Sequence, residues 1–319
     1  MDSIVSLAGL WPDTAVMLAA PPWEDPSLFA QLIVSGIASG SLFAILALAI
    51  VLIYRSTNIL NFAQGEMAMF TTFMAWTFMT RMDFWPAFFV ALLVAAAMGG
   101  ALERLVLRPV EDGPPLNSVI VTLGLFTIFN GLALWIWGPL PKGFGPFSVF
   151  DGSAMCASDV CIGRLNLGTL IVALIVMLAL YVLFQRTALG LAMRATAQNR
   201  LASQLVGIPV NNMLTLGWAL SATVGAVAGV LVAQSVSLTT GTLFVILLYA
   251  FAAAVLGGLD SSIGAVVGGL SIGVLKNLSA VYVPPEVGSV DVAMAFLVIV
   301  LVLMVRPAGL FGRPAARRV

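Results

Sequence analysis

The sequence predicts an all-α integral membrane protein, a polytopic helical bundle with about 8 to 10 membrane segments. Of its 319 residues, 61% are hydrophobic and only 9% are charged, whereas a soluble domain carries roughly 25% charged residues. Apolar stretches that approach the roughly 20 residues of a spanning helix recur along most of the chain. Basic residues gather in alternate connections, which predicts an outside N-terminus and a cytoplasmic C-terminus.

Nine apolar segments are expected to form membrane helices. They cover residues 29–54, 65–80, 85–105, 116–137, 167–184, 213–234, 243–259, 263–283 and 290–305. The second and seventh are short, so a full span and a broken or re-entrant segment both stay open for residues 65–80 and 243–259.

The chain divides into an N-terminal segment, one transmembrane domain and a short tail. Residues 1–28 are expected to form a periplasmic or interfacial segment, because a signal peptide needs a positive first region and the only early charge is Asp2. Residues 29–310 form a single transmembrane domain with a periplasmic loop at 138–166 and a cytoplasmic segment at 186–209. Residues 311–319 form a basic cytoplasmic tail.

The charges of the connections test this topology. Threading nine spans with the N-terminus outside places ten of the fourteen Lys and Arg residues on one side. These are Arg55, Arg104, Arg108, Arg186, Arg194, Arg200, Arg306, Arg313, Arg317 and Arg318. The other side receives only Arg81, Lys142 and Arg164. Such an excess marks the cytoplasmic face, so the protein is expected in the cytoplasmic (inner) membrane of a bacterial cell.

Residues 186–209 are polar and basic although they lie between two apolar segments. An apolar side chain recurs every fourth residue, which predicts one amphipathic helix. This stripe consists of Met193, Ala197, Leu201 and Leu205. Gly207 and Pro209 predict the end of the helix. Composition leaves open whether such a helix lies on the bilayer or docks into another protein.

The composition argues against several classes of protein. The chain has no histidine, which removes Ser-His-Asp and Cys-His catalysis and histidine metal sites. It has no GxxxxGKS phosphate loop, so we expect no nucleotide site of that kind and no cofactor in this chain. A formal net charge of zero gives no indication of nucleic-acid binding.

Cys156 and Cys161 lie in the loop that is expected outside the cell membrane. A disulfide is allowed in that oxidising compartment. Two unpaired, small apolar side chains are an equal alternative.

Polar residues between the first two spans are the richest candidate site, because polar groups within a membrane are costly and usually functional. They are Asn58, Asn61, Gln64 and Glu66. One interpretation is a broken element beside a translocation path or gate. The other is a cytoplasmic loop whose amide side chains cap the next helix. The sequence favours neither.

Lys276 lies within the eighth apolar segment. It either faces a water-filled path, pairs with an acid, or extends to the interface. Asp260 is expected to cap the next helix. Small residues also recur at helix-packing distance, and their usual meaning is close contact between helices. The glycines assigned to packing are Gly257, Gly258, Gly264, Gly268 and Gly269, beside pairs such as Gly36 and Gly40.

Three stretches resemble the LivH/LivM-type permeases, the membrane subunits of branched-chain amino acid ABC importers. NILNFAQGEM at 58–67 is similar to the family's N-F-A-H-G-E segment, with Gln64 where histidine is common. RATAQNRLASQLVGI at 194–208 is similar to its cytoplasmic loop, and FAAAVLGGLDSSIGAVVGGLSIG at 251–273 to its glycine-rich segment. With the ending RPAGLFGRP, the resemblance covers nearly everything after residue 30 and is nearer to LivH.

The resemblance implies an importer with two cytoplasmic ATPase subunits that hold ATP and Mg, a second LivM-type permease and a periplasmic solute-binding protein. It implies that the segment at 186–209 is the coupling helix that docks into an ATPase. The matching residues, with the neighbouring arginine, are Arg194, Ala197, Arg200, Ala202 and Gly207. Lys276 stands where a neutral or acidic residue is expected, so urea, short amides or another small solute stay open. A stand-alone ion-coupled secondary transporter is the rival.

Overall fold

The structure is a computed structural model. It describes residues 25–57, 59–110, 113–144, 150, 153–157, 160–282 and 291–312. Asn58, the first 24 residues and the tail from residue 313 lie outside the described residues, as do the sequence predictions that concern them.

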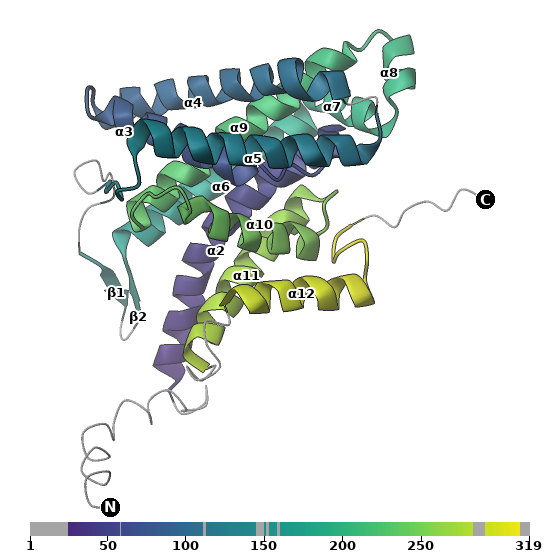
Figure 1. The fold of residues 1–319 in the computed structure, drawn as a ribbon. Helices are drawn as coiled ribbons and strands as arrows, with labels where there is room; N and C mark the ends of the chain where they lie inside the picture. The colour runs from purple at the N-terminus through teal and green to yellow at the C-terminus, as the bar shows by residue number, and fades with distance from the viewer. Residues whose placement is uncertain are drawn as a thin grey trace, which may run out of the picture.

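Nine apolar helices occupy the nine predicted positions in the part of the chain that the structure describes (Figure 1). They are α2 (Pro26–Thr57), α3 (Gln64–Met79), α4 (Phe84–Leu102), α5 (Pro115–Trp137), α6 (Arg164–Arg186), α9 (Val210–Ser235), α10 (Thr242–Gly257), α11 (Ser262–Tyr282) and α12 (Asp291–Val305). Six helical stretches are long and apolar enough to cross a membrane, α4 among them through its π and 3-10 continuation to Val110. The polytopic helical prediction is confirmed.

The two segments that looked short in the sequence are short helices that each follow a break. Both α3 and α10 have 16 residues, or about 24 Å of helix, less than the ~30 Å hydrocarbon core. Non-helical chain at 59–63 precedes α3, and non-helical chain at 236–241 precedes α10.

These breaks belong to a repeat that the sequence does not reveal. Each half of the chain contains a long helix, a break, a 16-residue helix and two further helices. The packing follows the same rule in both halves: α4 packs on α9 as α11 packs on α2, and α3 packs on α9 as α10 packs on α2. Helices α2 and α9 run antiparallel, because Ser221 contacts Ala49 while Gly217 faces Ser56. The two halves therefore form an inverted repeat.

Glycines allow the closest helix contacts of the core. A Cβ at Gly40 of α2 would lie 2.8 Å from the carbonyl oxygen of Gly269 in α11. At Gly268 a Cβ would collide with the Ala253 carbonyl of α10, and Gly257 and Gly264 face each other where α10 turns into α11. Gly258 has φ +100° and contacts the C-terminal segment at Gly312. These positions hold backbone against backbone, which a larger residue would prevent.

A small hairpin lies at the end of the molecule opposite to α7 and α8 (Figure 1). Strands β1 (Met155–Ala157) and β2 (Val160–Ile162) pair antiparallel, and Cys156 faces Cys161. The two cysteines form a disulfide. Gln31 at the start of α2 fixes the hairpin, because its side chain bonds both the N–H and the carbonyl of Cys161 at 2.8 Å. The loop at 138–166 therefore contains ordered structure.

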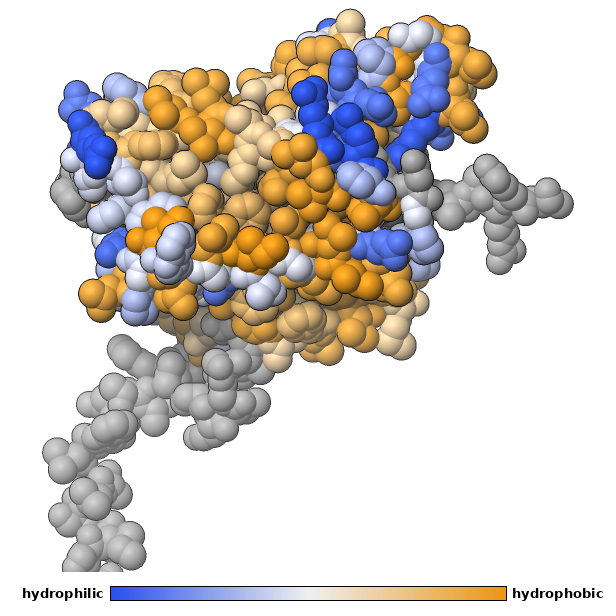
Figure 2. Space-filling model, turned by 45° about the horizontal axis from the view of Figure 1, so that its top comes forward, coloured by the Kyte–Doolittle hydropathy of each residue, from blue (hydrophilic) through white to orange (hydrophobic). Residues whose placement is uncertain are grey.

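The surface matches a membrane location. Figure 2 shows hydrophilic residues gathered toward the two ends of the molecule and a mainly apolar surface between them. Leu93, Trp135 and Ile175 are among the large apolar side chains left exposed on α4, α5 and α6. Such a surface faces lipid or another membrane subunit, because exposing so many large apolar side chains to water is unfavourable.

Candidate functional site

A buried polar cluster lies where α3 begins, in the middle of the protein. Asn61 and Gln64 are both fully buried, and Asn61 Nδ2 donates to Gln64 Oε1 at 3.2 Å. Gln64 Nε2 donates to the Ser221 carbonyl at 3.2 Å, and Ser221 Oγ lies 2.6 Å from the Ala49 carbonyl oxygen. The cluster therefore joins α3 to α9 and α2.

The depth of this cluster follows from α9. Ser221 lies near the middle of α9, so α3 begins roughly 16 Å above the cytoplasmic start of that helix. The chain between α2 and α3 thus returns into the membrane before α3 forms. Helix α3 has no side-chain cap. The cytoplasmic capping loop, one of the two interpretations of this sequence, therefore does not describe the structure.

Glu66 lies two residues after Gln64 on α3 and makes different contacts. Its side chain is 1% exposed, and Oε2 accepts a hydrogen bond from Asn130 Nδ2 of α5 at 3.3 Å. Asn130 also donates to the Thr240 carbonyl in the second break, at 3.0 Å. Glu66 thus lies beside both breaks, since a Cβ at Gly65 would lie 3.2 Å from the Leu243 carbonyl oxygen at the start of α10.

Lys276 does not join these polar residues. It lies half-buried on α11 with its Nζ 5.8 Å from the centre of the Tyr249 ring, a cation–π contact. Met294 and Val298 of α12 lie close by around a small cavity. The structure therefore separates Lys276 from Asn61, Gln64 and Glu66.

The cytoplasmic segment forms two helices where the sequence predicted one. Helix α7 (Ala188–Gln198) follows α6, and α8 (Arg200–Leu205) follows α7. The prediction of one helix is wrong because Asn199 is extended, with φ −157°, and its side chain accepts a hydrogen bond from Ala202 N. An asparagine that caps a new helix in this way ends the preceding one.

The predicted apolar stripe consequently divides between two surfaces. Met193 on α7 is buried at 4% exposure, whereas Leu201 and Leu205 on α8 are 74% and 89% exposed. Ala202 and Gly207 are also exposed, and Gly207 ends α8 with φ +84°. Ala197 is half-buried. Helix α8 thus forms an exposed apolar projection at the cytoplasmic side, made by Leu201, Leu205 and the following Val206.

Two arginines connect this segment to the rest of the protein. Arg200 donates to the Thr57 carbonyl at the end of α2, at 3.3 Å. Arg194 donates to Gln185 of α6 at 3.1 Å. Arg194 also lines a cavity of about 430 Å³, together with Arg55, Ser56 and Asp260. Asp260 does not cap α11 as expected, since Ser261 Oγ accepts the hydrogen bond from Gly264 N instead.

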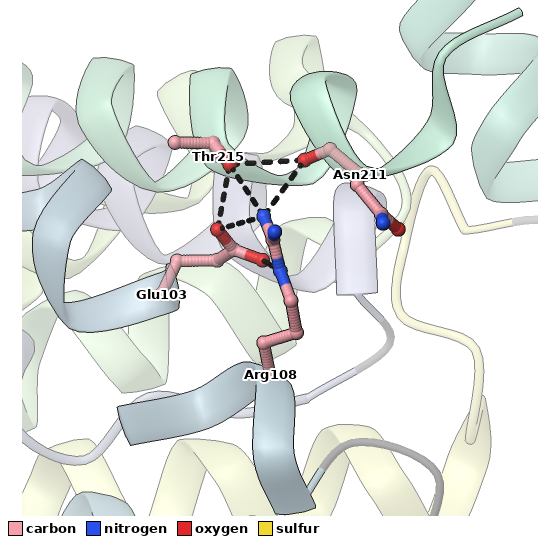
Figure 3. A network of polar contacts seen from close by, with 4 residues as sticks. All are labelled: Glu103, Arg108, Asn211 and Thr215. Atoms are coloured by element: carbon pink, nitrogen blue, oxygen red, sulfur yellow. Dashed lines mark hydrogen bonds and ion pairs between the residues drawn. The ribbon is translucent and has the colours of Figure 1, made fainter. Parts of the chain in front are cut away.

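A second polar network, which the sequence did not reveal, lies at the cytoplasmic end of α4 (Figure 3). Glu103 begins a π-helical turn, Glu103–Leu107. Its carboxylate pairs with Arg108 at 2.8 Å and accepts a hydrogen bond from Thr215 Oγ1 at 2.6 Å. Arg108 also donates to Thr215 Oγ1 at 2.9 Å and to the Asn211 carbonyl at 3.3 Å. The network joins α4 to the first turns of α9.

Asn130 and Ser221 are two further buried contacts that were not predicted from the sequence. Each lies within an apolar span, and a lone polar residue in such a span is itself a signal for a buried contact. Among the residues that the structure describes, no group of three or more His, Cys, Asp or Glu side chains is placed to bind a metal ion.

Comparison with known proteins identifies the family. A model described as "Branched-chain amino acid transport system / permease component" matches residues 32–305. The chain belongs to this family. BraD of Pseudomonas aeruginosa is 31% identical over 307 residues, covering 91% of this chain and 98% of that protein. LivH of Escherichia coli K12 is 30% identical with the same coverage. Both are named high-affinity branched-chain amino acid transport system permease proteins.

A solved structure also resembles this permease. It is titled "PsaBC from Streptococcus pneumoniae in complex with Fab", is 16% identical, and covers 86% of this chain and 91% of its own, with a TM-score of 0.47.

The three stretches that carry the family resemblance occupy distinct places in the permease. The first forms the break before α3 and the start of that helix, the second forms the end of α7 and all of α8, and the third forms the end of α10, the turn at Asp260 and the first half of α11. Arg200 links the second to the end of α2, directly before the first. The three motifs therefore lie at the break before α3, in the cytoplasmic segment, and at the turn between α10 and α11.

Proposed function

We propose that this permease forms half of the membrane pathway of an ATP-driven importer for branched-chain amino acids. The relatives that match nearly their full length carry that function in their names. Two cytoplasmic ATPase subunits supply ATP and Mg, a periplasmic binding protein delivers the solute, and a second LivM-type permease subunit completes the pathway. Asn61, Gln64 and Glu66 lie beside that pathway at the level where α3 and α10 begin.

The observation that carries the proposal is the exposed apolar projection of α8. Leu201, Leu205 and Val206 are 74%, 89% and 75% exposed, although water disfavours three such side chains on a cytoplasmic turn. Apolar side chains that enter a pocket are typical centres of a protein interface. An ATPase groove that receives α8 accounts for this exposure.

The contacts of α8 give the route by which a docked ATPase moves the membrane helices. Arg200 holds the end of α2 at Thr57, and the broken segment before α3 follows directly. Asn61 in that segment bonds Gln64, which bonds Ser221 of α9. Ser221 in turn bonds the Ala49 carbonyl of α2. A displacement of α8 is therefore transmitted to the break before α3. The break can change conformation without breaking helical hydrogen bonds, and α3 is reoriented for alternating access.

Replacing Leu205 by glutamate is expected to lower co-purification of the ATPase subunits and binding-protein-stimulated ATP hydrolysis by about tenfold or more, because a charge replaces an interface anchor. The measurement is pull-down and ATPase activity of the reconstituted complex. Met155→Glu is the matched control for docking, since Met155 is 56% exposed on the outer hairpin, and it should leave co-purification of the ATPase subunits near wild type.

Normal docking of the Leu205→Glu permease would contradict the coupling role. Uptake by vesicles that hold this chain alone, driven by an ion gradient and indifferent to ATP, would instead show a stand-alone secondary transporter. Affinities of the binding protein for leucine, isoleucine, valine, urea and short amides test the solute class.

A further inference from the structure

Glu66 has an unsatisfied carboxylate oxygen in the interior of the membrane domain. Oε2 accepts a hydrogen bond from Asn130, whereas Oε1 has no hydrogen-bond partner, although the side chain is only 1% exposed. A buried acceptor without a donor is destabilising, and an ionisable residue inside a membrane typically marks a functional pathway.

The inverted repeat shows that the fold itself does not require this carboxylate. Helices α3 and α10 have the same length, so the position equivalent to Glu66, the third residue of α3, is Phe244 in α10. The breaks themselves close alike in both halves, through Asn61 with Gln64 and through Thr239 with Thr242. A carboxylate at this position is therefore present in only one half of the inverted repeat.

The groups around Glu66 accept hydrogen bonds and offer few donors. Asn130 Nδ2 donates both to Glu66 and to the Thr240 carbonyl, so both protons of its amide group are in use. Glu66 and Thr240 thus share one donor, and Oε1 of Glu66 has none. A primary ammonium group supplies three N–H donors and a positive charge, which would satisfy this oxygen.

The starts of α3 and α10 provide the opposite charge. They lie side by side at Gly65 and Leu243, and neither has a side-chain cap. The first N–H of each helix bonds a carbonyl of its own break, so the N–H groups that follow it would bind an anion. The unpaired N–H groups of a helix start favour an anionic group, and broken helices in transporters bind carboxylates in this way. Together with the carboxylate of Glu66, these helix starts match a zwitterion.

We propose that Glu66 binds the ammonium group of a zwitterionic amino acid as it crosses the membrane, while the starts of α3 and α10 bind its carboxylate. The proposal rests on the transport function above and assigns the site that recognises the backbone of the solute. Because Glu66 is sealed from solvent, the solute reaches it when α3 or α10 moves, and both are short helices that follow a break.

The test uses the full complex in proteoliposomes with its binding protein. Uptake of leucine and stimulated ATP hydrolysis are measured for wild type, Glu66→Gln, Glu66→Asp and Thr71→Val. Thr71 is the control because it is equally buried on α3 and bonds only its own helix. We expect Glu66→Gln to lower uptake roughly 30-fold or more, with stimulated ATP hydrolysis retained. Glu66→Asp should restore part of the uptake, and Thr71→Val should stay within about twofold of wild type.

A structural role for Glu66 gives a different result. In a complex that assembles normally, it lowers uptake and stimulated ATP hydrolysis together, and that outcome, or uptake by Glu66→Gln within about twofold of wild type, overturns the proposal. If the glutamine variant does not assemble, Glu66→Asp decides: a raised leucine KM with unchanged ATP hydrolysis supports the site, and an unchanged KM overturns it. A wild-type complex that moves no branched-chain amino acid contradicts the proposed function instead.

Discussion

Replacing Gly269 by leucine is expected to prevent accumulation of the folded permease. A Cβ at this position would lie 2.5 Å from the N and Cα atoms of Ala44 in α2. Those are backbone atoms of a fully buried residue, so they cannot move aside as a flexible side chain does. Overpacking of this kind costs about 3 kcal/mol or more, a large part of the roughly 5–15 kcal/mol that stabilises a typical protein.

The matched control is Gly124→Leu on α5. No heavy atom lies within 4 Å of a Cβ built at Gly124, and leucine forms helix better than glycine by up to about 1 kcal/mol. The measurement is the yield of monodisperse protein in detergent and its melting temperature. We expect Gly124→Leu to equal wild type and Gly269→Leu to be nearly absent. Equal yields would show that the contact between α2 and α11 tolerates a side chain.

The sequence predicted the helices well because each apolar segment satisfies a local rule. A stretch such as Leu167–Phe184 must form a helix wherever it lies in the bilayer, because hydrocarbon offers its backbone no other hydrogen-bond partner. The arginine bias fixed the expected orientation through the same kind of local count. Neither rule depends on which helices touch.

The contacts could not be predicted because they join distant residues. Glu66 and Asn130 are 64 residues apart, and Thr215 is 112 residues from Glu103. Neither pair has a spacing that a helix or strand period would reveal. The break at Asn199 was missed for another reason: a four-residue apolar stripe continues through it, but the side-chain bond to Ala202 outweighs the stripe. The contacts of the candidate site could therefore be identified only from the tertiary structure.

Removing Arg108 is expected to destabilise the cytoplasmic end of α4. Glu103 is 1% exposed and Arg108 is 35% exposed, so Arg108→Met leaves a buried carboxylate with only the hydroxyl of Thr215. Breaking a buried ion pair costs about 3–5 kcal/mol of unfolding free energy. We expect a loss of about 3 kcal/mol here, because water can reach the space that Arg108 occupies and partly solvate Glu103. The melting temperature should fall by about 5 °C. Arg104→Met is the control, because Arg104 is exposed on the same turn.

A double-mutant cycle separates the ion pair from general damage. Glu103→Gln removes the negative charge and keeps the shape of the side chain. The double variant Glu103→Gln/Arg108→Met should therefore lose about 1–3 kcal/mol less unfolding free energy than the sum of the two single losses. Additive losses within roughly 0.5 kcal/mol would contradict a coupled pair.

This network also has a place in the proposed mechanism. Arg108 bonds Asn211, which lies at the start of α9, two residues after the end of the segment at 186–209. In the proposed mechanism, motion of α8 would therefore reach α9 and α4 together, as it would reach α2 through Arg200. The π-helical turn that begins at Glu103 brings Glu103 and Arg108 together. Because Arg108 links Glu103 to Asn211 of α9, Arg108→Met should uncouple α4 from this motion. Leucine uptake per ATP hydrolysed by the reconstituted complex should then fall, while Arg104→Met keeps the wild-type ratio. An unchanged ratio in Arg108→Met would confine the network to stability.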